Sequence, residues 1–274
     1  MVNVASTDPD QHQQERPLSY RIVKKTGRLD LNRRHLERDI SPPSPEHDYD
    51  GATFNEMLCL PCWGGLLILD PTYYCDLHCS FCSLSTDSKT RLDWSRLRRP
   101  LSLLTLNGLR QTVITGGEPG ILPDGERIIT DLRSWGISSV IMMTNGLWAQ
   151  KRERLKRFLA AGVTSVNISL KAWDDATGLA ITGSESLYTK QMAAIDNLAS
   201  SHGDGDLESI HVTHVITCDT IQGFKTGDWL ERLPLGVTVR LCMIESNQNL
   251  RRAIVPQAGT LQQSLLPILE RCTK

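Results

Sequence analysis

The chain has 274 residues, of which 40% are hydrophobic, and its formal net charge is -1. This is enough apolar sequence for one large domain or two small ones with a buried core. The charge is too small to attract nucleic acid or an anionic membrane surface. No segment approaches the roughly 18 apolar residues of a membrane span, and the first residues contain no apolar signal region. We therefore expect a cytoplasmic protein without membrane association.

Residues 1–50 are rich in Gln, Asp and Pro and show little apolar periodicity. They predict a polar, partly flexible N-terminal extension ahead of a main domain over residues 51–274. Within the extension, residues 19–31 alternate apolar and polar side chains around a Lys-Thr-Gly turn, which predicts a small hairpin.

From Gly64 onward, short β-branched-rich runs alternate with amphipathic segments. Strands are predicted at residues 65–70, 111–117, 138–146, 164–171, 210–218 and 237–244, and helices at 94–109, 124–135, 149–162, 186–201 and 261–272. Pro100 is expected to interrupt the first helix. This alternation predicts an α/β fold with a parallel sheet and helices on its outer face, and the strand count matches a partial (β/α)6 TIM-like barrel. Active sites of such barrels form at the carboxyl ends of the strands.

Three cysteines follow the first of these strands. Cys75, Cys79 and Cys82 are close enough for one short loop to turn their thiolates toward a single inorganic centre. Iron-sulfur clusters usually take four cysteine ligands, so a loop with three implies a cluster with one iron open to a substrate or cofactor. A zinc loop and buried cysteines are the alternatives. The chain's eight cysteines are too sparse for a disulfide scaffold and indicate a reducing compartment.

The CxxxCxxC spacing, with Phe81 just before the last cysteine, resembles the signature of the radical S-adenosylmethionine (SAM) superfamily. The resemblance implies a partial barrel and a 4Fe-4S cluster held by the three cysteines. It also implies that SAM binds the open iron, and that an electron from a donor such as flavodoxin or ferredoxin cleaves it to a 5'-deoxyadenosyl radical. We interpret a second pair, Cys59 and Cys62, as unligated thiols, because nothing downstream completes a metal site. A single-cluster enzyme is therefore expected.

Gly116, Gly117 and Glu118 follow the second strand and resemble the family's GGE motif. Glycines allow a close approach of backbone to a ligand, and a carboxylate accepts charge-assisted hydrogen bonds from an ammonium group. The resemblance implies that this motif binds the amino group of SAM. Thr144 and Asn145, at the end of the third strand, match a TNG sequence common in the family, although Asn-Gly is also a good turn. The Thr144 hydroxyl could bind the ribose or the carboxylate of SAM.

The fourth strand places Asn167, Ser169 and Lys171 on one face, where polar side chains need a ligand or partners. Ser169 and Lys171 are candidates for the ribose hydroxyls and the carboxylate of SAM. Arg240, on the sixth strand, could pair with a carboxylate of cofactor or substrate, or form a structural ion pair.

Other polar residues near the strand ends are weaker candidates. His214 and Asp219 could transfer protons, although a satisfied structural role is favoured for them and for His211 and Cys218; Glu245 and Asn247 could line the substrate side.

The substrate is the least determined feature. The fourth-strand sequence VNISL resembles the molybdenum-cofactor cyclase branch, whereas LKAWDDATGLAITG resembles glycyl-radical activating enzymes. The activating enzymes commonly carry acids at the positions of Ser169 and Met143, which argues against that branch. We expect a small-molecule substrate such as a sugar, nucleoside or natural-product intermediate. A peptide or protein substrate, and a non-catalytic zinc-binding or interaction module, remain alternatives.

Overall fold

A computed structural model describes residues 20–24, 65–82, 84, 88–223, 227–243 and 264. Within these residues the strands form one sheet in the order β1 to β7. Strand β1 pairs antiparallel with β2, and all later neighbours are parallel. The strands are β1 (Tyr20–Lys24), β2 (Gly65–Leu69), β3 (Gln111–Ile114), β4 (Ser139–Thr144), β5 (Ser165–Leu170), β6 (Ser209–Ile216) and β7 (Val237–Met243). The six predicted parallel strands, and with them the α/β partial-barrel fold, are confirmed.

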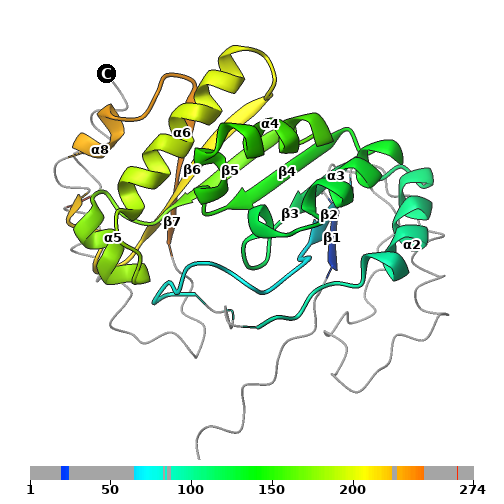
Figure 1. Ribbon diagram of the computed structural model, residues 1–274, viewed down its shortest axis with the longest axis horizontal. Helices are drawn as coiled ribbons and strands as arrows, with labels where there is room; N and C mark the ends of the chain where they lie inside the picture. Colours follow the sequence, from blue (N-terminus) through cyan, green and yellow to red (C-terminus); the bar gives the residue numbers. More distant parts are fainter. Residues whose placement is uncertain are drawn as a thin grey trace, which may run out of the picture.

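Helices alternate with the strands and gather on one side of the sheet, whereas the segment that follows β2 runs along the other side (Figure 1). The helical elements are α2 (Trp94–Leu106), η2 (Pro119–Ile121), α3 (Gly125–Ser134), η3 (Leu147–Gln150), α4 (Arg152–Ala161), α5 (Asp175–Thr182), α6 (Leu187–Gly203) and α8 (Asp228–Glu231). Among the described residues, no helix is long and apolar enough to cross a membrane.

The structure corrects the expected break at Pro100. Helix α2 continues through this proline. A proline in a helix removes one hydrogen bond to the carbonyl four residues earlier. That carbonyl belongs to Arg96, an exposed residue, so water can replace the missing donor.

Strand β1 pairs with β2 and extends the described sheet at its edge. Tyr20 lies opposite Leu69 and Lys24 opposite Gly65. The second arm of the predicted hairpin falls outside the described residues, as do the two cysteines Cys59 and Cys62 and nearly all of the predicted helix at 261–272.

The hydrophobic core lies between the sheet and the helices. Alternate strand residues such as Leu67, Val140 and Ile168 point to this side and have no exposed surface. They pack with helix residues such as Leu132 and Phe158 in one buried cluster. The opposite strand residues therefore face the concave side, and the loops at the strand ends are left to build a site.

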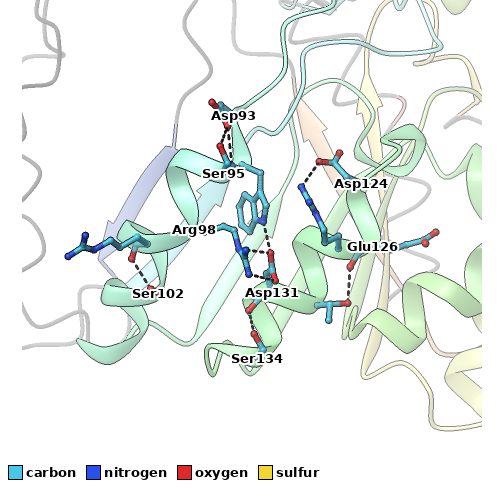
Figure 2. A network of polar contacts seen from close by, with 12 residues as sticks. Asp93, Ser95, Arg98, Ser102, Asp124, Glu126, Asp131 and Ser134 are labelled. Atoms are coloured by element: carbon cyan, nitrogen blue, oxygen red, sulfur yellow. Dashed lines mark hydrogen bonds and ion pairs between the residues drawn. The ribbon is translucent and has the colours of Figure 1, made fainter.

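Polar contacts fasten α2 to α3 beside this core (Figure 2). The indole Nε1 of Trp94 donates to Asp131 over 2.7 Å, and the guanidinium Nε of Arg98 lies 3.1 Å from the same carboxylate. Trp94 also stacks on Trp135 with ring centroids 5.7 Å apart. These contacts join the two helices that cover β2 and β3.

Thr112 on β3 is the basis of a stability prediction. Its side chain is fully buried on the helix side of the sheet, and its hydroxyl has no hydrogen-bond partner within the described part of the chain. A buried hydroxyl without a partner loses its hydration without compensation. Thr112→Val should therefore raise the free energy of unfolding by about 1 kcal/mol, measured by urea denaturation.

Thr164 provides the matched control for this prediction. Its hydroxyl accepts from the backbone N–H of Val140 over 3.0 Å and donates to the carbonyl of the same residue. Thr164→Val should lower the free energy of unfolding by about 1–3 kcal/mol, because the buried N–H of Val140 loses this acceptor. The Val140 carbonyl still accepts from the main-chain N–H of Thr164. Equal effects of the two substitutions would contradict this interpretation.

Candidate active site

A cavity of about 200 Å³ lies at the carboxyl ends of β2 to β5. Every residue predicted to hold the cluster or to contact SAM lines it except Arg240. Cys75, Cys79 and Cys82 come from the loop after β2, and Phe81 lines the cavity beside them. Four chain segments that are far apart in sequence therefore meet at one place.

The cysteine loop is held at both ends. On one side, the N–H of Gly117 donates to the carbonyl of Thr72 over 2.7 Å, and the N–H of Glu118 donates to the carbonyl of Tyr74 over 2.9 Å. On the other side, the N–H of Ser80 donates to the carbonyl of Ile181 at the end of α5, over 2.9 Å. The loop thus crosses the carboxyl-end edge of the sheet, from the turn after β3 to the end of α5.

The two glycines of the GGE motif are required by this contact. Gly116 has a φ of +98°, a conformation that favours glycine. A Cβ atom on Gly117 would overlap the main-chain carbonyl of Tyr74 and lie 2.6 Å from the carbonyl oxygen of Tyr73. The cysteine loop can lie against the turn after β3 only because these side chains are absent.

The buried side chain of Glu118 connects the GGE turn to the TNG turn through hydrogen bonds. Its carboxylate is 1% exposed and accepts from the Thr144 hydroxyl (2.6 Å), the Asn145 N–H (2.6 Å) and the Gly120 N–H (2.8 Å). Burial raises the pKa of Glu118 to about 7, although these hydrogen bonds favour the charged form. The glutamate therefore joins the turn after β3 to the TNG turn after β4 while it borders the cavity.

Asn145 connects the TNG turn to the cysteine loop. Its side-chain amide donates to the carboxylate of Asp76 over 2.6 Å, and its side-chain oxygen accepts from the N–H of Leu147 over 2.9 Å. Asp76 directly follows the first cysteine, so Asn145 fixes the loop beside Cys75. The sequence analysis missed Asp76, whose only signal was its place within the cysteine motif.

Lys171 lies among polar and aromatic partners at the end of β5. Its ammonium donates to the Ser169 hydroxyl over 2.6 Å and lies 5.2 Å from the ring centroid of Phe81. Both partners line the same cavity. A positive charge at this point can pair with an anionic group of a ligand.

Burial of Cys75 and Cys79 favours the protonated form of both thiols in the ligand-free protein. Burial raises the pKa of Cys75 to about 12. Burial also raises the pKa of Cys79, which the nearby charge of Lys171 opposes. Thiols must lose their protons to bind a metal, so assembly of a metal centre here releases protons and brings in the positive charge that stabilises the thiolates.

The donor set fits an iron-sulfur cluster with one open iron. The cavity lining contains three cysteines and no histidine, and thiolates are the ligands of such clusters. Among the described residues, no group of three or more His, Cys, Asp and Glu side chains is close enough to hold one metal ion in common. In a cluster each cysteine binds a different iron.

Arg240 does not reach the cavity. It is exposed on β7, in register with Thr213, which in turn pairs with Ser169. It shares the concave face of the sheet with Ser169 and lies near His211, whose pKa is lowered by burial and by the arginine's charge.

His214 belongs to the core on the other face. It is 1% exposed, its Nδ1 lies 3.0 Å from the carbonyl of Leu170, and its ring stacks on Trp229. Burial lowers its pKa to about 4. Cys218 and Asp219 are exposed and do not line the cavity, whereas Glu245 and Asn247 lie outside the described residues.

Residues 69–223 match the family model described as Radical SAM superfamily. The GTP 3',8-cyclase of Yersinia pestis is 28% identical over 212 residues, which cover 73% of this chain and 62% of that protein. The GTP 3',8-cyclase of Synechococcus elongatus is 32% identical over 136 residues, which cover 47% of this chain and 41% of that protein. The chain thus spans less than two thirds of either relative.

Solved structures share the fold at low identity. Streptococcus suis SuiB bound to precursor peptide SuiA has a TM-score of 0.59 at 17% identity, over 81% of this chain and 49% of SuiB. TYW1 with a lysine-pyruvate adduct has a TM-score of 0.54 at 15% identity, over 75% of this chain and 73% of TYW1.

The buried carboxylate predicts a specific pH dependence in the ligand-free protein. Burial raises the pKa of Glu118 to about 7 in the folded protein, from an ordinary value of 4.5. Between these values the folded state holds more protons than the unfolded state, so raising the pH destabilises the fold. The free energy of unfolding of the wild type, relative to Glu118→Gln, should fall by up to about 3 kcal/mol from pH 4.5 to 7 and stay level above. Urea denaturation at several pH values measures this difference, and parallel curves would contradict the pKa shift.

Proposed function

Because this chain belongs to the radical SAM superfamily, whose family model matches more than half of it, we propose that it abstracts a hydrogen atom from a small-molecule substrate. The chain is a radical SAM enzyme, and its cofactors are a 4Fe-4S cluster and SAM. The observation that supports the proposal most directly is the convergence of the cysteine loop, the GGE turn, the TNG turn and the end of β5 on one cavity.

Each group of cavity residues has a role in this proposal. Cys75, Cys79 and Cys82 hold the cluster through three thiolates. When bound, the cluster supplies the electron that cleaves SAM, and SAM supplies the radical. The glycines of the GGE turn let the cysteine loop lie against it, and Glu118 provides negative charge near the ammonium group of SAM.

The end of β5 binds the rest of SAM in this arrangement. Lys171 carries the positive charge that pairs with the carboxylate, and Ser169, 2.6 Å from it, offers a hydroxyl to the ribose. Thr144 does not contact the ligand through its hydroxyl, because that hydroxyl donates to Glu118 and accepts from the indole N–H of Trp148 and the main-chain N–H of Gly146. Its role is to hold the carboxylate in place.

A small-molecule substrate is supported by the relatives named GTP 3',8-cyclase. A peptide substrate is the second candidate, motivated by the activase-like sequence after β5 and by the fold shared with peptide-bound SuiB. A soluble flavodoxin or ferredoxin is the proposed electron donor.

Anaerobic incubation of the reconstituted protein with SAM, a reductant and deuterated candidate substrates tests the proposal. Transfer of deuterium into 5'-deoxyadenosine from a nucleoside or sugar, and not from peptides, would support a small-molecule enzyme. Transfer from peptides alone would favour the second candidate. A reconstituted protein without absorbance near 400 nm, or without 5'-deoxyadenosine formation, would overturn the radical SAM assignment of this site.

The cysteines supply a prediction with internal controls. Changing Cys75, Cys79 or Cys82 to Ala should abolish the intact cluster and all SAM cleavage, because each removes a ligand. Cys218→Ala and Cys242→Ala should retain both, since these exposed cysteines lie outside the cavity lining. Iron and sulfide content and 5'-deoxyadenosine yield measure the outcome, and a cluster-free Cys218→Ala variant would contradict the ligand assignment.

Glu118 supplies a prediction about SAM. Glu118→Ala should weaken SAM binding by about tenfold or more, because it removes charge and frees the TNG turn, while the cluster stays visible. Glu126→Ala is the control, since Glu126 pairs with Arg157 between α3 and α4, outside the cavity lining. Loss of the cluster in Glu118→Ala would contradict the assigned role.

A further inference from the structure

Gln191 is a fully buried polar side chain on α6, a helix that packs behind the sheet. Its amide nitrogen donates to the main-chain carbonyls of Asn145 (2.7 Å) and Ser169 (2.9 Å). Its amide oxygen accepts from the N–H of Lys171 over 3.2 Å. One side chain therefore binds main-chain atoms from three residues that line the cavity.

These contacts occur where the sheet itself stops holding the two strands together. The last pair in the ladder between β4 and β5 is Thr144 with Ile168. Asn145 and Ser169 come directly after it, so the ladder no longer fixes the distance between them. The planar amide of Gln191 replaces the missing hydrogen bonds and determines how far apart the two turns lie.

The chemistry of this position selects an amide. Two carbonyl oxygens require two N–H donors, and one main-chain N–H requires an acceptor, and a glutamine side chain offers both kinds of group in one plane. Burying a polar group is unfavourable unless its hydrogen bonds are made. An apolar residue of similar length would fill the space but leave three buried main-chain groups without a side-chain partner.

We propose that Gln191 is a positioning residue for SAM. It sets the separation between the TNG turn and the end of β5. Through Asn145 it also fixes Asp76 beside the first cysteine, because the Asn145 side chain donates to that carboxylate. This inference rests on the proposed function, since it assumes that SAM occupies the cavity between these two strand ends.

The test compares two conservative substitutions on α6. Gln191→Glu keeps the acceptor for the Lys171 N–H but places a carboxylate against two carbonyl oxygens. Asn197 is the matched control because its amide also donates to two main-chain carbonyls, those of Ala149 and Gln150, which do not line the cavity. Asn197→Asp therefore removes the same kind of contact from the same helix.

The experiment measures the SAM affinity of the reconstituted holoprotein. Binding is monitored through the change that SAM produces in the electron paramagnetic resonance spectrum of the reduced cluster. Gln191→Glu should raise the Kd for SAM about tenfold or more with unchanged iron and sulfide content. Asn197→Asp should leave the Kd unchanged. An unchanged Kd in Gln191→Glu, or an equal rise in Asn197→Asp, would overturn the inference.

Two further measurements keep the inference testable if Gln191→Glu does not fold. Gln191→Met preserves length and apolar packing without placing charge near the carbonyls, and it should also raise the Kd. In the wild type, amide hydrogen exchange at Lys171 should be as slow as in the neighbouring ladder, and rapid exchange would overturn the inference. A wild type that holds its cluster but binds no SAM would instead overturn the proposed function.

Discussion

The site depends on the hydrogen bonds that the buried carboxylate of Glu118 accepts. This carboxylate accepts hydrogen bonds from the turn after β3 and from the turn after β4. A charge in this position is unfavourable without such donors, so both turns must adopt the geometry that supplies them. The turn after β3 also packs against the cysteine loop, because its two glycines allow the close approach and its N–H groups donate to carbonyls of the loop. The positions of the thiols, the GGE turn and the TNG turn therefore follow from one another.

The sequence predicts most of this arrangement because the motifs are local. Short β-branched runs identified all six parallel strands, and the order of the strands placed the cysteines, Glu118, Thr144 and Lys171 at one edge. The predicted helix break at Pro100 was wrong, because a helix on the surface tolerates the loss of one main-chain hydrogen bond. The sequence left two roles open for Arg240 and did not determine which face of the sheet it lies on. The strand register places it on the concave face, and it does not line the cavity.

The contacts that hold the site together were not predictable in the same way. Gln191 lies 46 positions after Asn145 and has no motif around it. Its role depends on how α6 packs behind β4 and β5, which is a property of tertiary structure. The same holds for Asp76 in the loop after β2, because its partner Asn145 lies in the turn after β4. Sequence patterns identify the groups that face a ligand, whereas the groups that position them are found only when the chain is folded.

The concave face of the sheet differs in polarity from one half to the other. Strands β2 to β4 present residues such as Ile68 and Ile141, whereas β5 and β6 present serine, asparagine, threonine and histidine. Part of this polar half is satisfied internally, since Thr213 donates to Asn167 over 2.9 Å. Within this polar half, Ser169 and Lys171 at the end of β5 border the cavity. The polar groups placed to meet a ligand therefore lie where the strands end, whereas the Thr213–Asn167 contact joins β5 to β6 beneath them.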